Sequence, residues 1–173
     1  TSLLDMYGSA VGIDPVSAVV ARARQLFPNV DFCVATPGNR SDWFSGPFDV
    51  AVCSEVIEHI EHNEQRRFLL DVSSLVKVGG SVILTTPRGE LFNSWKEHGH
   101  RSRMQPIEAW LSESDLDHLA LTCGLQVIRR DRCHPLSFAL RNTGLFQRRP
   151  FSWLFKRLGY GSTNEWDSMI YQI

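Results

Sequence analysis

The stretch GPFDVAVCSEVIEHI, residues 46–60, is the most informative part of the sequence. Phe48–Ser54 is a short run of β-branched and other apolar residues preceded by Gly and Pro, which is typical of a buried strand. Ser54 to His59 would then follow the end of that strand. In sheets of parallel strands covered by helices, ligands bind beyond the carboxyl ends of the strands. The stretch therefore predicts an α/β fold with a binding site just after the strand.

Two similar strands precede this stretch. Ala10–Asp14 and Val30–Ala35 are short apolar runs. Between them, Pro15 starts a segment rich in Ala and Arg that favours a helix until Pro28. Alternating strands and helices predict βαβ units, in which helices cover both faces of a mostly parallel sheet.

The residues after Ile60 predict a long helix that ends at Gly79 and Gly80. Ser81–Thr86 is then expected to form a strand, closed by Pro87. One face of the helix would carry Phe68, Leu69, Val72, Leu75 and Val76.

A further helix and two strands are expected towards the C-terminus. Ser112 and Asp115 have the spacing of a variant capping box, and Gly124 is well placed to end the helix that they begin. Leu125–Arg132 predicts a strand. The alternating sequence of Asp167–Ile173 predicts an antiparallel strand at the edge of the sheet.

Two segments lack a clean period. Arg88–Trp110 is predicted to be a long irregular connection and, because long loops in compact domains are often functional, a candidate substrate lid. Residues 136–166 are predicted to be a helical or loop insertion before the last strand. The basic and aromatic side chains of this insertion could cover a lipid-like acceptor or contact a membrane surface, but an ordinary amphipathic helix packed on the sheet is the preferred interpretation.

Composition excludes several classes of protein. The chain of 173 residues is long enough for one domain, 1–173, and its formal net charge of −1 gives no reason to expect a polyanionic partner. No apolar run approaches the roughly 20 residues of a membrane span, and the start lacks the order of a signal peptide. The four cysteines have no CxxC spacing. We expect a soluble, cytoplasmic protein with reduced thiols, and the sequence contains no recognisable RNA-binding module.

Asp14 ends the early strand in AVGIDP. A carboxylate at that place can accept hydrogen bonds from both ribose hydroxyls of a nucleotide. The alternative is that Asp14 only caps the following helix, where free backbone amides favour a carboxylate.

Glu55, Glu58 and His59 have the i, i+3, i+4 spacing that could place two carboxylates and an imidazole on one side of a helical turn. One of them could be a general base, with His59 best matched to neutral pH. The alternative is a turn whose Glu and His side chains only tie the sheet edge to a helix.

The ordered motifs AVGIDP, PNVDFCVA, GPFDVAVCSEVIEHI, LVKVGGSVILTTP and LTCGLQVI resemble class I S-adenosylmethionine-dependent methyltransferases, and in particular the small-molecule and quinone-pathway subgroup. The resemblance runs from the second strand of that family to the sixth. It implies a Rossmann-like methyltransferase sandwich with S-adenosyl-L-methionine as the cofactor. TSLLDMYGSA, residues 1–10, looks like the tail of the helix that follows the glycine-rich loop, so the first strand and that loop are expected to be missing from this sequence.

The resemblance also implies roles for individual residues. After the corresponding strand, the family often has an Asp that binds the adenine amine. This sequence has no Asp there, so Thr36, a backbone carbonyl or Asn39 would take its place. His100, on the irregular connection, is a candidate for contact with the methyl acceptor. The implied cofactor-binding residues are Asp14, Pro15, Thr36, Ser54 and Glu55, and the candidate catalytic residues are His59, Glu55 and His100.

The ExxEH cluster also resembles the metal-binding part of small-RNA 2′-O-methyltransferases. Glu55, Glu58 and His59 would be the ligands, joined by His98 or His100. The downstream His and Trp residues are spaced differently from that family, and the several oxygen ligands that magnesium needs are not evident. The sequence therefore predicts no metal as the first interpretation.

The predicted function is transfer of a methyl group from S-adenosylmethionine to an oxygen or nitrogen of a small-molecule or lipid-linked acceptor. Because the leaving sulfur is neutral, catalysis can be mainly positioning. The missing glycine loop and adenine-binding acid motivate an alternative, a degenerate methyltransferase-like binding or scaffold domain. A metal-dependent RNA 2′-O-methyltransferase is a third interpretation. The sequence does not indicate the acceptor, since this fold serves many substrates.

Overall fold

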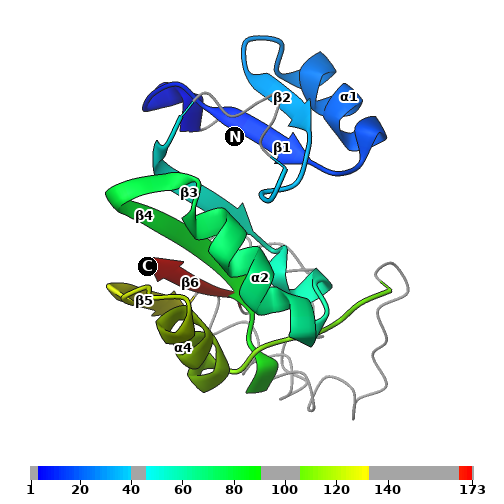
Figure 1. Cartoon of the computed structure of the whole chain (residues 1–173). Coiled ribbons are helices and arrows are strands. Elements are labelled where there is room, and N and C mark those ends of the chain that lie inside the picture. Colours follow the sequence, from blue (N-terminus) through cyan, green and yellow to red (C-terminus); the bar gives the residue numbers. More distant parts are fainter. Residues whose placement is uncertain (1–3, 40–45, 91–105, 133–167, 173) are drawn as a thin grey trace, which may run out of the picture.

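The computed structural model describes residues 4–39, 46–90, 106–132 and 168–172. Along the first half of the described chain the order is strand, helix, strand, strand, helix, strand, as expected (Figure 1). The strands are β1 (Val11–Asp14), β2 (Asp31–Val34), β3 (Phe48–Ser54), β4 (Val76–Pro87), β5 (Arg129–Arg132) and β6 (Ser168–Gln172). The helices are α1 (Ser17–Leu26), α2 (His62–Ser73) and α4 (Glu113–Thr122), with 3₁₀ turns η1 (Leu4–Met6) and η2 (Ile57–His59).

The described strands form two sheets. β1 and β2 pair in parallel, and the second sheet has the order β3-β4-β6-β5, in which β3 and β4 are parallel. The arrows of β1 and β3 point the same way in Figure 1, so Asp14 and Ser54 end their strands at the same edge of the molecule. The sides of β1 and β3 that face each other pair with no described strand.

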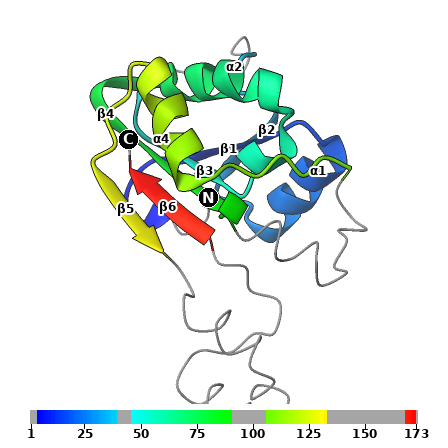
Figure 2. The same ribbon diagram turned by 90° about the horizontal axis from the view of Figure 1, so that it is seen from below.

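The main apolar core lies between the four-stranded sheet and the helices α2 and α4. Figure 2 shows these two helices on one side of the strands and α1 on the other. Along β4, Val82, Leu84 and Thr86 are fully buried because alternate side chains of a strand face the same side. The buried core residues are Ile57, Leu69, Val72, Val82, Leu84, Leu111, Leu116 and Ala120.

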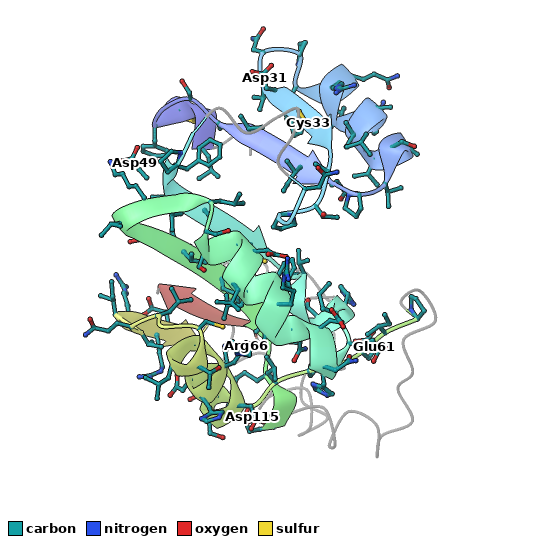
Figure 3. The ribbon with its side chains drawn as sticks, in the orientation of Figure 1. Asp31, Cys33, Asp49, Glu61, Arg66 and Asp115 are labelled. Carbon is teal, nitrogen blue, oxygen red and sulfur yellow. The ribbon has the colours of Figure 1, made fainter. Side chains whose placement is uncertain are left out.

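The capping box predicted at the start of α4 is confirmed. The Ser112 hydroxyl accepts a hydrogen bond from the Asp115 N–H at 3.1 Å and donates one to the Asp115 carboxylate at 2.6 Å. The helix ends just before Gly124, as expected. Arg66, labelled in Figure 3, projects from α2 and donates to the Thr122 carbonyl at 3.2 Å, so a neighbouring helix satisfies one of the last carbonyls of α4.

The helix predicted after Ile60 is present as α2, but its predicted end at the glycine pair is wrong. α2 ends at Ser73, and the Ser73 and Ser74 hydroxyls donate to the carbonyls of Leu70 and Asp71. Such local bonds compete with continuation of a helix. β4 already begins at Val76, a residue that the sequence pattern predicts to lie on a face of the helix.

Gly79 and Gly80 therefore lie inside β4. The register between β3 and β4 shifts between Phe48 and Val50, close to the glycines. A Cβ atom on Gly80 would lie 2.8 Å from the carbonyl oxygen of Asp49 on the neighbouring strand. The glycines thus permit an irregularity and a close backbone approach within the strand pair, which a sequence pattern does not distinguish from a helix end.

The C-terminal strand is antiparallel as predicted, but its predicted place at the sheet edge is wrong. β6 lies between β4 and β5, where Tyr171 is paired with Leu84 on one side and Arg130 on the other. The strand at this edge of the described sheet is β5, which begins at Arg129 rather than at the predicted Leu125. The sequence of β5, Arg-Arg-Asp-Arg, suits this place because charged side chains protect an open edge from further pairing.

Part of one predicted segment and the whole of another lie outside the described residues. His98 and His100 of the expected lid belong to residues 91–105, and the entire expected insertion, 136–166, is likewise outside. Residues 106–111 carry no regular secondary structure. Of the helices in the described ranges, none combines the length and the apolar character needed to cross a membrane.

Gly89 allows the chain after β4 to meet the segment that precedes α4. Its N–H donates to the Leu111 carbonyl at 2.8 Å, and a Cβ atom would lie 2.6 Å from the Leu111 carbonyl carbon. We expect Gly89→Ala to lower the free energy of unfolding by about 1–3 kcal/mol, because the two backbones would have to separate. Urea denaturation measures this. Gly8→Ala is the control, since nothing lies within 4 Å of its Cβ position, and equal effects of the two substitutions would contradict the prediction.

Candidate functional site

The first half of the candidate site lies at the carboxyl ends of β1 and β2. Asp14 is half-buried, and its carbonyl oxygen accepts a hydrogen bond from the Ala35 N–H at 3.1 Å. This bond continues the strand pairing and brings Thr36, the next residue, to the edge at which Asp14 lies. Pro15 and Thr36 are both exposed there. Three of the predicted cofactor-binding residues are thus brought together.

The Asp14 carboxylate stabilises the turn that leads into α1. Its Oδ1 accepts a hydrogen bond from the Val16 N–H at 2.8 Å. Val16 itself is the N-cap residue of α1 and makes no side-chain capping bond. A carboxylate has two oxygens, so this turn leaves Oδ2 for a ligand hydroxyl. The structural and the ligand-binding interpretations of Asp14 are therefore compatible.

The second half of the site lies where β3 and β4 end. The hydroxyl oxygens of Ser54 and Thr85 are 2.9 Å apart, and the Glu55 N–H donates to the Thr85 carbonyl at 2.9 Å. Glu55 has a φ of 52°, in the left-handed region that residues with a side chain seldom occupy. Residues in such sparsely populated conformations cluster at functional sites.

Glu58 is buried beneath this turn, with 2 % of its surface exposed. Its Oε2 accepts a hydrogen bond from the Thr86 hydroxyl at 3.1 Å. Burial raises the pKa of Glu58 to about 7, and the negative charge of Glu55 contributes to the increase. Burial also raises the pKa of the neighbouring Cys53 thiol to about 12, so that this thiol stays protonated. Glu58 is therefore a buried carboxyl that changes protonation near neutral pH.

His59 is partly exposed, and a backbone carbonyl determines which of its nitrogens carries a proton. Its Nδ1 lies 3.1 Å from the carbonyl oxygen of Ile107. Because a carbonyl oxygen can only accept, Nδ1 is the protonated nitrogen of the neutral ring. Nε2 lies 3.8 Å from Glu58 Oε1, which is longer than a hydrogen bond. The geometry thus leaves Nε2 able to accept a proton.

Gln65 was not predicted as part of the site. The return segment, which we define as Ile107–Leu111, was predicted only as the end of the candidate substrate lid, Arg88–Trp110. Gln65 is 1 % exposed, and its Nε2 donates to the carbonyls of Ile57 at 3.0 Å and Ala109 at 2.8 Å. The Ala109 N–H donates to the Glu58 carbonyl at 2.7 Å. Gln65 stands in the polar run EHNEQRR, where nothing local distinguishes a buried amide from an exposed one.

The structure does not bring the predicted metal ligands into a metal site. Among the residues that the structure describes, no group of three or more His, Cys, Asp or Glu side chains could hold a metal ion. Glu55, Glu58 and His59 all belong to the described part of the chain. His98, which the metal interpretation also used, and His100, a candidate catalytic residue, lie outside it.

Comparison with known proteins identifies the family. The methyltransferase domain family matches residues 5–161. The chain belongs to this family. The ubiquinone biosynthesis O-methyltransferase of Erwinia tasmaniensis is 30 % identical over 79 residues, which are 46 % of this chain and 32 % of that protein. The matched part of the methyltransferase domain thus spans about a third of the length of this curated relative.

Solved structures share the fold of this methyltransferase domain. The PH0226 protein of Pyrococcus horikoshii gives a TM-score of 0.67 at 16 % identity, over 98 % of this chain and 73 % of that one. The magnesium protoporphyrin IX methyltransferase of Synechocystis PCC 6803, solved with bound SAM, gives 0.60 at 14 % identity, over 99 % of this chain and 62 % of that one. The expected Rossmann-like methyltransferase fold is confirmed.

The buried Glu58 predicts that stability depends on pH. Its pKa rises from the ordinary 4.5 to about 7 on folding, so the native state binds the extra proton between these values. The resulting stabilisation is fully present below about pH 4.5 and is lost as the pH rises to about 7. Glu58→Gln removes the charge and keeps an acceptor for Thr86. We expect the variant to gain about 2–3 kcal/mol relative to wild type between about pH 4.5 and about pH 8.

Urea denaturation across this pH range measures the effect. Glu61→Gln is the matched control, because Glu61 is exposed at the N-terminus of α2 (Figure 3) and its substitution removes a charge without changing a buried group. A stability difference between Glu58→Gln and wild type that stays constant with pH would contradict the prediction.

Proposed function

We propose that this domain belongs to a methyltransferase that transfers the methyl group of S-adenosylmethionine to an oxygen or nitrogen of a small-molecule or lipid-linked acceptor. The observation that carries the proposal is the convergence of two groups of polar residues on one edge of the sheets. Asp14 and Thr36 form one group, and Ser54, Glu55 and His59 form the other. Ligands of parallel α/β folds bind beyond this edge.

The residues at the end of β1 and β2 fit the nucleoside part of the cofactor. The free oxygen of the Asp14 carboxylate can accept hydrogen bonds from ribose hydroxyls, while Oδ1 keeps the turn in place. Thr36 is proposed to border the adenine, and the Ser54–Glu55 turn to line the cleft. The Synechocystis relative, solved with bound SAM, supports this choice of ligand. The bound cofactor would supply an activated methyl group and leave a neutral sulfur.

An acceptor hydroxyl or amine loses a proton as its bond to the methyl group forms and the bond from methyl to sulfur breaks. We propose that His59 Nε2 takes this proton, because the Ile107 carbonyl holds the other ring nitrogen in its protonated form. Glu55, in its strained turn, is the second candidate for this role. His100 stays a prediction. The O-methyltransferase name of the Erwinia relative favours an oxygen acceptor.

The two alternatives have less support. A metal-dependent RNA methyltransferase would need a ligand set, and the described ranges contain none. A scaffold domain would bind no cofactor, so a binding experiment separates it from an enzyme. Cys33, Cys53 and Cys123 are free thiols in the described part of the chain, and this suits the cytoplasmic location that we propose.

Calorimetry with S-adenosylhomocysteine on the complete polypeptide tests the proposal. We expect Asp14→Ala to weaken binding about 10- to 100-fold, because one or two hydrogen bonds to a charged group are lost. Asp14→Asn separates the two roles of the side chain. The amide oxygen introduced by this substitution can still accept a hydrogen bond from the Val16 N–H and so keep the turn. The neutral amide lacks the negative charge that would strengthen hydrogen bonds from the ribose hydroxyls.

Asp31→Ala is the matched control, since Asp31 is exposed at the opposite end of the β1–β2 pair (Figure 3). We expect this variant to bind like wild type and Asp14→Asn to bind more weakly than wild type. If wild type binds no S-adenosylhomocysteine, or if Asp14→Ala binds as tightly as wild type, the proposal is wrong.

A further inference from the structure

Two hydrogen bonds join η2 to the return segment. The Ala109 N–H donates to the Glu58 carbonyl at 2.7 Å, and His59 Nδ1 lies 3.1 Å from the Ile107 carbonyl oxygen. The segment therefore returns along the turn that carries the proposed base, and two successive residues of the turn contact it. Neither η2 nor the return segment belongs to a sheet or a long helix that would hold it in place.

Gln65 connects the two parts from a third element. It lies in the first turn of α2, where its own N–H donates to the Glu61 carbonyl at 3.1 Å. Its amide group donates one hydrogen bond to the Ile57 carbonyl of η2 and one to the Ala109 carbonyl of the return segment. Its Oε1 lies 3.2 Å from His62 Nδ1. Both the nitrogen and the oxygen of this buried amide thus have hydrogen-bond partners, as buried polar groups require.

The two carbonyls that Gln65 joins belong to residues close in sequence to the His59–Ile107 contact. Ile57 precedes His59 by two residues, and Ala109 follows Ile107 by two. A single planar amide that bonds both carbonyls limits how far η2 and the return segment can move apart. The contact between His59 Nδ1 and the Ile107 carbonyl depends on that separation, because a hydrogen bond weakens steeply with distance and angle.

We propose that Gln65 is a positioning residue, which holds η2 against the return segment so that the Ile107 carbonyl keeps His59 in the Nδ1–H form with Nε2 free to accept a proton. This inference rests on the proposed role of His59 in the methyltransferase reaction. It assigns to Gln65 no contact with substrate or cofactor.

In the described part of the chain, a second group near the ring, the Glu58 carboxyl, does not determine which nitrogen of His59 carries the proton. Its Oε1 lies 3.8 Å from His59 Nε2, and its Oε2 accepts a hydrogen bond from Thr86 on β4. At that distance Glu58 makes no hydrogen bond that would select one neutral form of the ring. The return segment presents the Ile107 carbonyl to Nδ1. The form of the ring is thus decided by the contact that Gln65 maintains.

Nuclear magnetic resonance of the histidine ring nitrogens tests the proposal without any ligand. The two nitrogens have different chemical shifts when protonated and unprotonated, so the spectrum reports the form of each ring directly. In wild type we expect His59 to be in the Nδ1–H form. Gln65→Met keeps the length and most of the volume of the side chain but removes the amide, and we expect the Nδ1–H fraction of His59 to fall about twofold or more as the second form appears.

His62→Ala is the matched control. It removes the partner of the Gln65 oxygen but leaves both donor bonds to the carbonyls, so the His59 signals should stay as in wild type. His118, exposed on α4, serves as the internal reference in every spectrum. If Gln65→Met does not fold, Gln65→Asn replaces it, since an amide shorter by one methylene cannot hold both carbonyls at their present separation.

The proposal is overturned if His59 of wild type is in the Nε2–H form, or if a folded Gln65 variant leaves the His59 spectrum unchanged. A change of equal size in His62→Ala would overturn it as well. Absence of S-adenosylhomocysteine binding would contradict the proposed function but would not alter these spectra, so the two failures are distinguishable.

Discussion

The polar side chains of Glu58 and Gln65 are buried beside the apolar core, and each must find hydrogen-bond partners there. Glu58 accepts from Thr86 at the end of β4, and Gln65 donates to carbonyls of η2 and of the return segment. These bonds join the end of the four-stranded sheet, the turn after β3 and the chain that leads into α4. Without these hydrogen bonds, the buried amide of Gln65 and the buried carboxyl of Glu58 would each carry the full free-energy cost of desolvation.

Further hydrogen bonds fix the side chains at the edge where the candidate site lies. The carboxyl ends of β1 and β3 lie on one side of the molecule, so Asp14 and the turn after Ser54 share it. Asp14 is held by the turn into α1, and His59 by the return segment. A site of this kind needs side chains that are fixed before a ligand arrives, because displacement at a carbon atom depends mainly on alignment.

Local sequence predicted those elements whose signals lie within a few residues of one another. β1, α1, β2 and β3 are close to their predicted positions, and α4 begins at the predicted capping box. The helix end at Gly79–Gly80 was wrong because a glycine pair also suits a bulge against a neighbouring strand. The edge position of β6 was wrong because an alternating pattern indicates a strand but does not say which strands flank it.

The sequence by itself determined the family, the α/β class and the residues Asp14, Ser54, Glu55 and His59 as candidates, since these follow from motifs at the ends of predicted strands. Only the tertiary structure decided which groups those residues contact. Ile107 is 48 residues away from His59 along the chain, and Ala109 is 44 away from Gln65. No local pattern encodes which distant carbonyl meets a given side chain. The protonated nitrogen of His59 and the burial of Glu58 therefore follow from packing between segments that are remote in the sequence.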